Sequence, residues 1–241
     1  MRHAFTHLAV GLVLAGGVMA QASAHYLWIE AQGNEHRLYF GEVQEGVKEK
    51  IPGKLDAFAK LTAREVKGGA ARPLEVTPSA DAFILRAPAG APQVVAADEN
   101  QPVRDLGKYG LGMAKSNYYA KFLATPLQAV AGGTVLDLVP ASTGNAREFQ
   151  VLYRGQPLPR AKVEVIAPNT WVQEHQSGSD GKVRINTPWK GRYVVHVLHV
   201  DKQAGEFGGA RYENLRNHMT LTFDQAEGTD PGPAIAPQKP E

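Results

Sequence analysis

The chain contains the run Tyr193-Val194-Val195-His196-Val197-Leu198-His199-Val200, in which apolar side chains occupy both alternating faces. Side chains point to opposite sides at successive positions of a β-strand. A strand that is apolar on both faces is covered on both, so the run predicts a central strand in a layered β fold. The same alternation puts His196 and His199 on opposite faces, so at most one of them can belong to a given site.

Short apolar segments separated by turn residues surround this central run. The turn-prone segments Gly155–Ala161 and Gly178–Gly181 punctuate the second half of the chain. We expect strands here at Glu148–Tyr153, Val163–Ile166, Val183–Ile185 and His218–Phe223. Antiparallel strands at this spacing are typical of an immunoglobulin-like sandwich. The polar stretch Gln173–Gln176 is expected to be a loop.

The first half of the chain predicts a second β region. We expect strands at Tyr26–Ile29, Arg37–Phe40, Leu61–Val66, Leu74–Val76, Phe83–Arg86, Gln93–Ala97, Tyr118–Leu123 and Thr134–Val139. Apolar residues recur at helical spacing between Pro52 and Lys60, which predicts one short helix. The Gly- and Lys-rich segment Asp105–Asn117 is expected to be a long loop.

Composition divides the chain into four segments. Residues 1–24 are expected to be a signal peptide, 25–142 an N-terminal β domain and 143–224 an immunoglobulin-like domain. The division follows the small and turn-prone residues of Ala141–Asn145. The Pro- and Gly-rich tail, residues 225–241, is expected to be disordered. The expected fold class is therefore all-β, with two β-sandwich-like domains and one short helix.

The amino terminus has the features of a secretory signal peptide. Arg2 precedes an apolar run from Leu8 to Ala20, and Ala22-Ser23-Ala24 is a small-x-small cleavage signature. The run is too short to anchor the protein, and no later stretch reaches the ~20 apolar residues of a spanning helix. We expect cleavage after Ala24, a periplasmic location and no stable membrane insertion.

Charge and residue content exclude several classes of function. The formal net charge is +2, with basic and acidic residues interspersed, which argues against a nucleic-acid partner. The chain has no Cys, which excludes thiolate metal sites and cysteine catalysis. Only Met113 and Met219 remain after cleavage, which argues against a methionine-rich copper(I) site.

Cleavage after Ala24 would make His25 the first residue of the mature protein. A terminal α-amine has a reference pKa of about 7.7–8.0, so it loses its proton far more readily than a lysine does. The amine and a ring nitrogen of one residue can chelate a single divalent ion, which a histidine inside a chain cannot do. The alternative is that the ring of His25 packs without binding metal.

Several motifs together resemble a known exported family. They are His25-Tyr26-Leu27-Trp28, Leu38-Tyr39-Phe40-Gly41-Glu42, Gly155-Gln156-Pro157-Leu158, Ser179-Asp180-Gly181, Gly191-Arg192-Tyr193 and Arg216-Asn217-His218-Met219-Thr220-Leu221-Thr222-Phe223. The resemblance covers about residues 25–224. It is to the domain-of-unknown-function family whose members are often labelled periplasmic components of nickel or cobalt uptake systems. It implies His25, His199 and His218 as metal ligands and an inner-membrane permease as partner.

Each candidate ligand also has an ordinary structural alternative. His218 opens the last expected strand and His199 ends a buried one, so each imidazole could face a cleft or donate to a backbone carbonyl. Glu42 could add an oxygen ligand or orient a ligating imidazole. It could instead pair with Lys48 or Lys50. A donor set of amine, imidazole and carboxylate suits nickel, cobalt, copper or zinc, with copper favoured by intrinsic affinity.

The sequence shows no catalytic arrangement: it has no Gly-x-Ser-x-Gly elbow, no His-Glu-x-x-His helix and no Gly-rich phosphate loop. Together with the terminal histidine, the family resemblance implies a non-enzymatic periplasmic protein that binds a divalent nickel, cobalt or copper ion and supports its uptake. One alternative is a structural or adhesive exported β-sandwich without metal. Another is a copper histidine-brace oxidase with a flat aromatic surface built from Tyr109, Tyr118 or Tyr119. Adjacent positions alternate in a strand, so Tyr118 or Tyr119 should be core.

Overall fold

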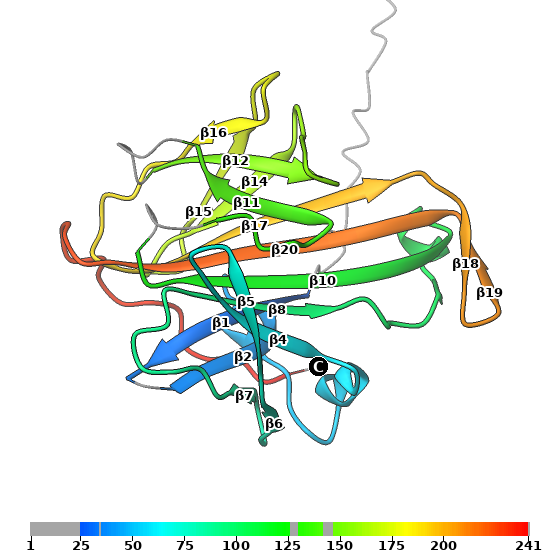
Figure 1. Ribbon diagram of the computed structural model, residues 1–241, viewed down its shortest axis with the longest axis horizontal. Helices are drawn as coiled ribbons and strands as arrows, with labels where there is room; N and C mark the ends of the chain where they lie inside the picture. Colours follow the sequence, from blue (N-terminus) through cyan, green and yellow to red (C-terminus); the bar gives the residue numbers. More distant parts are fainter. Residues whose placement is uncertain (1–24, 34, 126–129, 142–146, 241) are drawn as a thin grey trace, which may run out of the picture.

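The computed structural model describes residues 25–33, 35–125, 130–141 and 147–240, and strands dominate it (Figure 1). This confirms the all-β, sandwich-like fold class. The signal peptide expected at residues 1–24 and the domain junction expected at 142/143 lie outside the described residues.

The strands follow the order of the expected apolar segments. The first half contains β1 (Tyr26–Gln32), β2 (Glu35–Glu42), β3 (Val47–Lys48), β4 (Thr62–Lys67), β5 (Ala70–Leu74), β6 (Val76–Pro78), β7 (Phe83–Leu85), β8 (Gln93–Asp98), β9 (Arg104–Asp105) and β10 (Met113–Leu123). The second half contains β11 (Leu136–Pro140), β12 (Glu148–Tyr153), β13 (Gln156–Pro157), β14 (Lys162–Ile166), β15 (Val172–Gln176), β16 (Lys182–Arg184), β17 (Gly191–Asp201), β18 (Gly205–Phe207), β19 (Ala210–Tyr212) and β20 (Asn214–Gln225).

The helical segments are short 3₁₀ turns. The first, η1 (Lys54–Phe58), lies where helical spacing predicted the short helix, and it buries Leu55 and Phe58. The second, η2 (Gly107–Tyr109), lies in the segment that we expected to be a loop, between β9 and β10. Both turns lie near the cavity described below.

The strands form three main layers (Figure 1). The middle layer is a nine-stranded sheet in the order β15-β14-β17-β20-β10-β8-β4-β5, with β9 beside β10. A five-stranded sheet of β1, β2, β7 and β6, with β3 beside β2, covers one face. A four-stranded sheet of β11, β12 and β13, with β16 beside β12, covers the other. The β18–β19 hairpin projects from one end.

Alternation along β20 explains why both faces of the middle sheet are buried. Met219 and Leu221 point into the hydrophobic cluster shared with β12, where Phe149 is fully buried. Thr220 points the other way, and its hydroxyl donates to the carbonyl oxygen of Leu27 in β1 at 2.6 Å. The hydroxyl therefore ties β1 to the middle sheet, while the apolar neighbours form the core on the opposite side.

The two halves of the chain share this middle sheet. β10, from the first half, pairs in parallel with β20, from the second, and β17 lies on the other side of β20. The central position predicted for the Tyr193–Val200 run is thus confirmed. The described strands on either side of the expected domain junction are joined by backbone hydrogen bonds between β10 and β20.

Besides the segment Asp105–Asn117, whose residues 113–117 belong to β10, two further segments differ from their sequence-based expectation. The polar stretch Gln173–Gln176, expected to be a loop, belongs to β15, an edge strand that needs few apolar residues because β14 alone pairs with it. The described part of the tail, residues 226–240, makes backbone hydrogen bonds despite its composition. Thr229 donates to Pro188, and Gln238 donates to Gly46, each at 3.0 Å.

Candidate functional site

His25 directly precedes β1 and is held between two carboxylates. Its Nδ1 lies 2.9 Å from Oε1 of Glu42, and its Nε2 lies 2.7 Å from Oε1 of Glu49. Both carboxylates are buried, at 7% and 2% exposure. Lys54, from η1, contacts the same oxygen of Glu49 at 3.1 Å. The ring is therefore fixed in position through both of its nitrogens.

The pairing of β1, β2 and β3 brings the two carboxylates to His25. Glu42 ends β2, and Glu49 follows β3, where its backbone N–H donates to the carbonyl of Phe40 at 2.9 Å. Gly41 has φ of 146°, and a side chain there would collide with the carbonyl oxygen of Val47. A glycine at this position lets β3 pack close against β2, and that approach places Glu49 next to His25.

Opposing effects act on the protonation of His25. Burial lowers the pKa of His25, but its hydrogen bonds to Glu42 and Glu49 outweigh burial and raise the pKa above its ordinary value. Coulombic repulsion by Lys54 opposes this rise. The two carboxylates therefore favour the protonated, cationic form of the imidazole.

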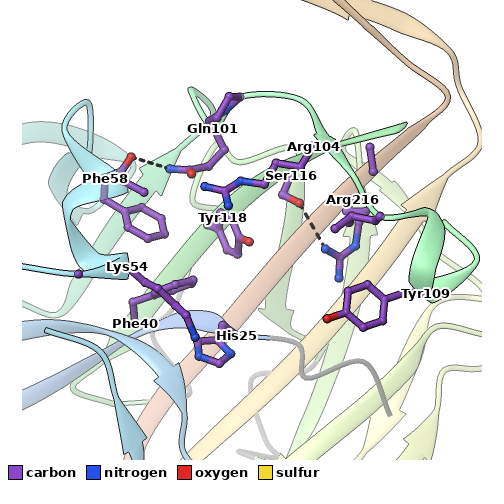
Figure 2. A pocket seen from close by; sticks show the side chains of 15 residues that line it. His25, Phe40, Lys54, Phe58, Gln101, Arg104, Tyr109, Ser116, Tyr118 and Arg216 are labelled. Atoms are coloured by element: carbon purple, nitrogen blue, oxygen red, sulfur yellow. Dashed lines mark hydrogen bonds between the residues drawn. The ribbon is translucent and has the colours of Figure 1, made fainter. Parts of the chain in front are cut away.

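His25 lines a cavity of about 430 Å³ (Figure 2). Its basic lining side chains are Lys54, Arg104 and Arg216, and none of the described residues that line it is acidic. The aromatic lining side chains are Phe40, Phe58, Tyr109 and Tyr118. The cavity combines an apolar wall with several cationic groups, whereas Glu42 and Glu49 contact His25 from outside the lining.

His218 lies in a stack of rings and does not line the cavity. It stacks on Tyr118, with ring centroids 4.8 Å apart and an interplanar angle of 15°. Its Nδ1 lies 3.4 Å from Nε2 of His196, which in turn stacks on Tyr26 at 4.4 Å. His196 Nδ1 contacts Glu164 at 3.0 Å. The ring of Tyr118 connects the cavity to the ring stack, since it lines the cavity and also packs on His218.

His199 lies on the opposite face of β17 from His196, as the alternation predicted. Its ring packs against Tyr153 of β12, with centroids 4.4 Å apart. Of the three histidines implied as ligands, only His25 lines the cavity. His218 and His199 are directed into different layers of the fold, so the structure does not bring the three together.

Sequence reasoning identified Glu42 as a possible partner of the imidazole but missed Glu49. Glu49 lies in the charged segment Lys48-Glu49-Lys50, which reads as solvent-exposed. Its burial depends on the short pairing of β2 with β3, which no local apolar pattern predicts. Gly41 is the available signal in the sequence, because a glycine inside a strand often marks a close approach of two backbones.

The tyrosines considered for a flat aromatic surface point in different directions. Tyr119 is buried in the core shared with β12, and its hydroxyl donates to Glu99 at 2.6 Å. Tyr118 is packed edge-on against Phe40 and stacks on His218. Tyr109 is 45% exposed at the cavity. The expectation that at least one of the adjacent tyrosines is core is confirmed.

The burial of His218 should make stability depend on pH. Burial holds the pKa of His218 well below its ordinary value, and the nearby charge of Arg216 acts in the same direction. His218 is therefore protonated near pH 6.5 in the unfolded chain but stays neutral at that pH in the folded state. The free energy of unfolding should fall as pH drops below about 6.5, by up to ~1.4 kcal/mol per pH unit for this group.

Urea unfolding at pH 7.5 and pH 5.5 tests this expectation. Replacing His218 by Gln should reduce the loss of stability between the two pH values by about 1 kcal/mol. His175→Gln, on the edge strand β15, is the control and should keep the wild-type difference. An equal loss in wild type and His218→Gln would show that His218 is not the source.

The described side chains around His25 include potential metal donors but no complete donor set. No group of three or more His, Asp or Glu side chains in the described part of the chain is arranged to hold a metal ion. His25 and Glu42 supply two donor atoms, Nδ1 and Oε1, within 2.9 Å of each other. Cleavage after Ala24 would add the α-amine of His25 as a third donor, on the same residue as Nδ1.

Within the described residues, no helix is long and apolar enough to cross a membrane.

The comparisons with known proteins identify a family. No curated protein and no solved structure matches the chain. The family described as a domain of unknown function, DUF4198, matches residues 22–201. The chain therefore belongs to the DUF4198 family, as the resemblance to a family of unknown function led us to expect.

Proposed function

We propose that the mature protein is a periplasmic metal-binding protein that captures a nickel, cobalt or copper ion for uptake through an inner-membrane permease. The observation that carries this proposal is the position of His25. Its ring lies at the wall of a cavity, with one buried carboxylate on each ring nitrogen. Removal of residues 1–24 would expose its α-amine at the same point.

The proposed donor set is the α-amine and Nδ1 of His25 with a carboxylate oxygen of Glu42. The amine and Nδ1 belong to one residue and form a chelate ring with the ion. Glu42 lies beside Nδ1, so a small shift of its side chain admits an ion between them. Nitrogen donors with one carboxylate suit divalent nickel, cobalt and copper. The remaining coordination positions would face the cavity.

Glu49 has a different role in this arrangement. A metal-binding histidine usually donates its second ring N–H to a carboxylate or carbonyl, which fixes the ring and raises its basicity. Glu49 lies at 2.7 Å from Nε2 and is suited to accept that hydrogen bond. Lys54 holds Glu49 in turn. Because all nitrogen donors must be deprotonated, metal binding should release protons and weaken as pH falls.

Replacing Glu49 by Gln tests the proposed orienting role. The variant keeps the volume of the side chain but removes the charge that polarises the imidazole. We expect affinity for nickel and copper to fall by about 10–100-fold, the usual cost of losing such a partner. Isothermal titration of the processed protein with each metal chloride measures the change.

Glu45→Gln is the matched control, because Glu45 is an exposed glutamate in the segment between β2 and β3. It should bind metal as the wild type does. Glu42→Gln should weaken binding at least as much as Glu49→Gln, since it removes a donor oxygen. Equal affinities for Glu49→Gln and Glu45→Gln would contradict the orienting role.

A further inference from the structure

Arg216 is a buried cation whose guanidinium lacks a full set of partners. The residue is 9% exposed, and its Nη1 donates to the hydroxyl of Ser116 at 3.4 Å. Its Nε is buried without a hydrogen-bond partner among the described residues, and none of the described carboxylates forms an ion pair with it. Burial lowers the pKa of Arg216, while the nearby phenol of Tyr118 opposes this effect.

Such a group is costly in a folded protein. Removing a charge from water without a counter-ion is strongly unfavourable, and buried charges are normally paired. Arg216 lines the cavity, and its guanidinium has the planar, forked geometry that binds a carboxylate or phosphate through two hydrogen bonds. The counter-ion that this position requires is therefore an anion in the cavity.

The rest of the cavity selects among anions. Figure 2 shows the guanidinium of Arg216 and the hydroxyl of Tyr109 directed toward the same space as His25 and Lys54. Arg104 adds a further cation. A volume of about 430 Å³ lies in the usual range for a small organic ligand and exceeds the needs of an inorganic ion. The apolar wall of the cavity suits the carbon skeleton of an organic acid. The separate basic side chains of the cavity suit an acid with several carboxylates.

We propose that this cavity binds a small organic acid with two or more carboxylates and that the metal reaches His25 as a complex with such an acid. The second part rests on the function proposed above. A di- or tricarboxylate would place one carboxylate on Arg216 and leave others for Arg104 and for the metal. The acid would then fill the coordination positions that His25 and Glu42 leave open.

Isothermal titration of metal-free processed protein with citrate tests the anion site alone. We expect citrate to bind and Arg216→Gln to weaken it by about tenfold or more, because a buried charged pair loses one partner. Arg184→Gln, at an exposed position of β16, is the control and should leave citrate binding unchanged. Arg104 is exposed at the cavity, and Arg104→Gln should weaken citrate binding several-fold. This variant replaces Arg216→Gln in the test if circular dichroism shows that Arg216→Gln does not fold.

The remaining titrations separate this inference from the proposed function. Nickel chloride without citrate should bind the wild type, and nickel–citrate should bind the wild type more tightly than Arg216→Gln. Citrate binding without nickel binding would reject the metal function and retain the anion site. Absence of citrate binding, or equal citrate affinity in wild type, Arg216→Gln and Arg104→Gln, would overturn the inference. So would binding of glycerol phosphate or inorganic phosphate as tight as that of citrate.

Discussion

Mature protein with Ala in place of His25 is expected to bind nickel and copper at least about 100-fold more weakly than wild type. The terminal amine remains in this variant, but Nδ1 is lost, so the chelate ring cannot form. Loss of a direct ligand should exceed the 10–100-fold cost of losing an orienting partner. Glu42 and Glu49 also lose the group that separates their charges. Titration of the processed variant with nickel and copper chloride measures the effect.

His196→Ala is the histidine control for this experiment. His196 belongs to the ring stack with Tyr26 and His218, and it does not line the cavity. We expect this variant to lose stability and to retain metal affinity. If His196 proved essential and His25 dispensable, the metal would have to bind in the ring stack, which would contradict the proposed site.

Replacing Lys121 by Ala is expected to lower the free energy of unfolding by about 3–5 kcal/mol. Lys121 is 0% exposed and forms a buried ion pair with Asp137, and its Nζ also donates to the carbonyl of Leu138 at 2.8 Å. Without Lys121, the carboxylate of Asp137 stays buried with backbone donors alone, one of them the N–H of Gly132 at 2.6 Å. Urea unfolding at pH 7.5 measures the loss.

Two further variants make the Lys121 result specific. Lys67→Ala, at an exposed position of β4, should change stability by less than about 0.5 kcal/mol. The double variant Lys121→Met with Asp137→Asn should recover part of the loss, because no unpaired charge remains buried. A loss below about 1 kcal/mol for Lys121→Ala would contradict the importance of this pair to the fold.

Local pattern predicted most of the strands, because alternation and turn residues report burial within one segment. The run from Tyr193 to Val200 has covering layers on both faces, and its two histidines point apart as expected. The pattern could not show that strands from both halves share one sheet. That arrangement depends on the parallel pairing of β10 with β20, which joins residues about a hundred positions apart.

The candidate site was predictable to the extent that its residues are close in the sequence or on one strand pair. His25 directly precedes β1 and Glu42 ends the neighbouring strand β2, and both were identified as candidates. Glu49 and Arg216 were not identified as site residues, because their burial arises from strand pairing and layer packing rather than from local composition. The layers that separate His199 from His218 are likewise a property of the whole fold.

The most direct test of the account compares nickel binding by two proteins that differ by one residue. The first is the processed protein that begins at His25, and the second retains one extra residue before His25, with both starts verified by intact mass. The extra residue converts the α-amine into an amide while leaving every side chain of the site in place. We predict that the extension weakens nickel binding by about 100-fold or more, since the backbone nitrogen of His25 is then an amide, which must lose a far less acidic proton than an amine before it can bind the metal. Equal affinity in the two proteins would contradict the claim that the terminal amine of His25 binds the metal.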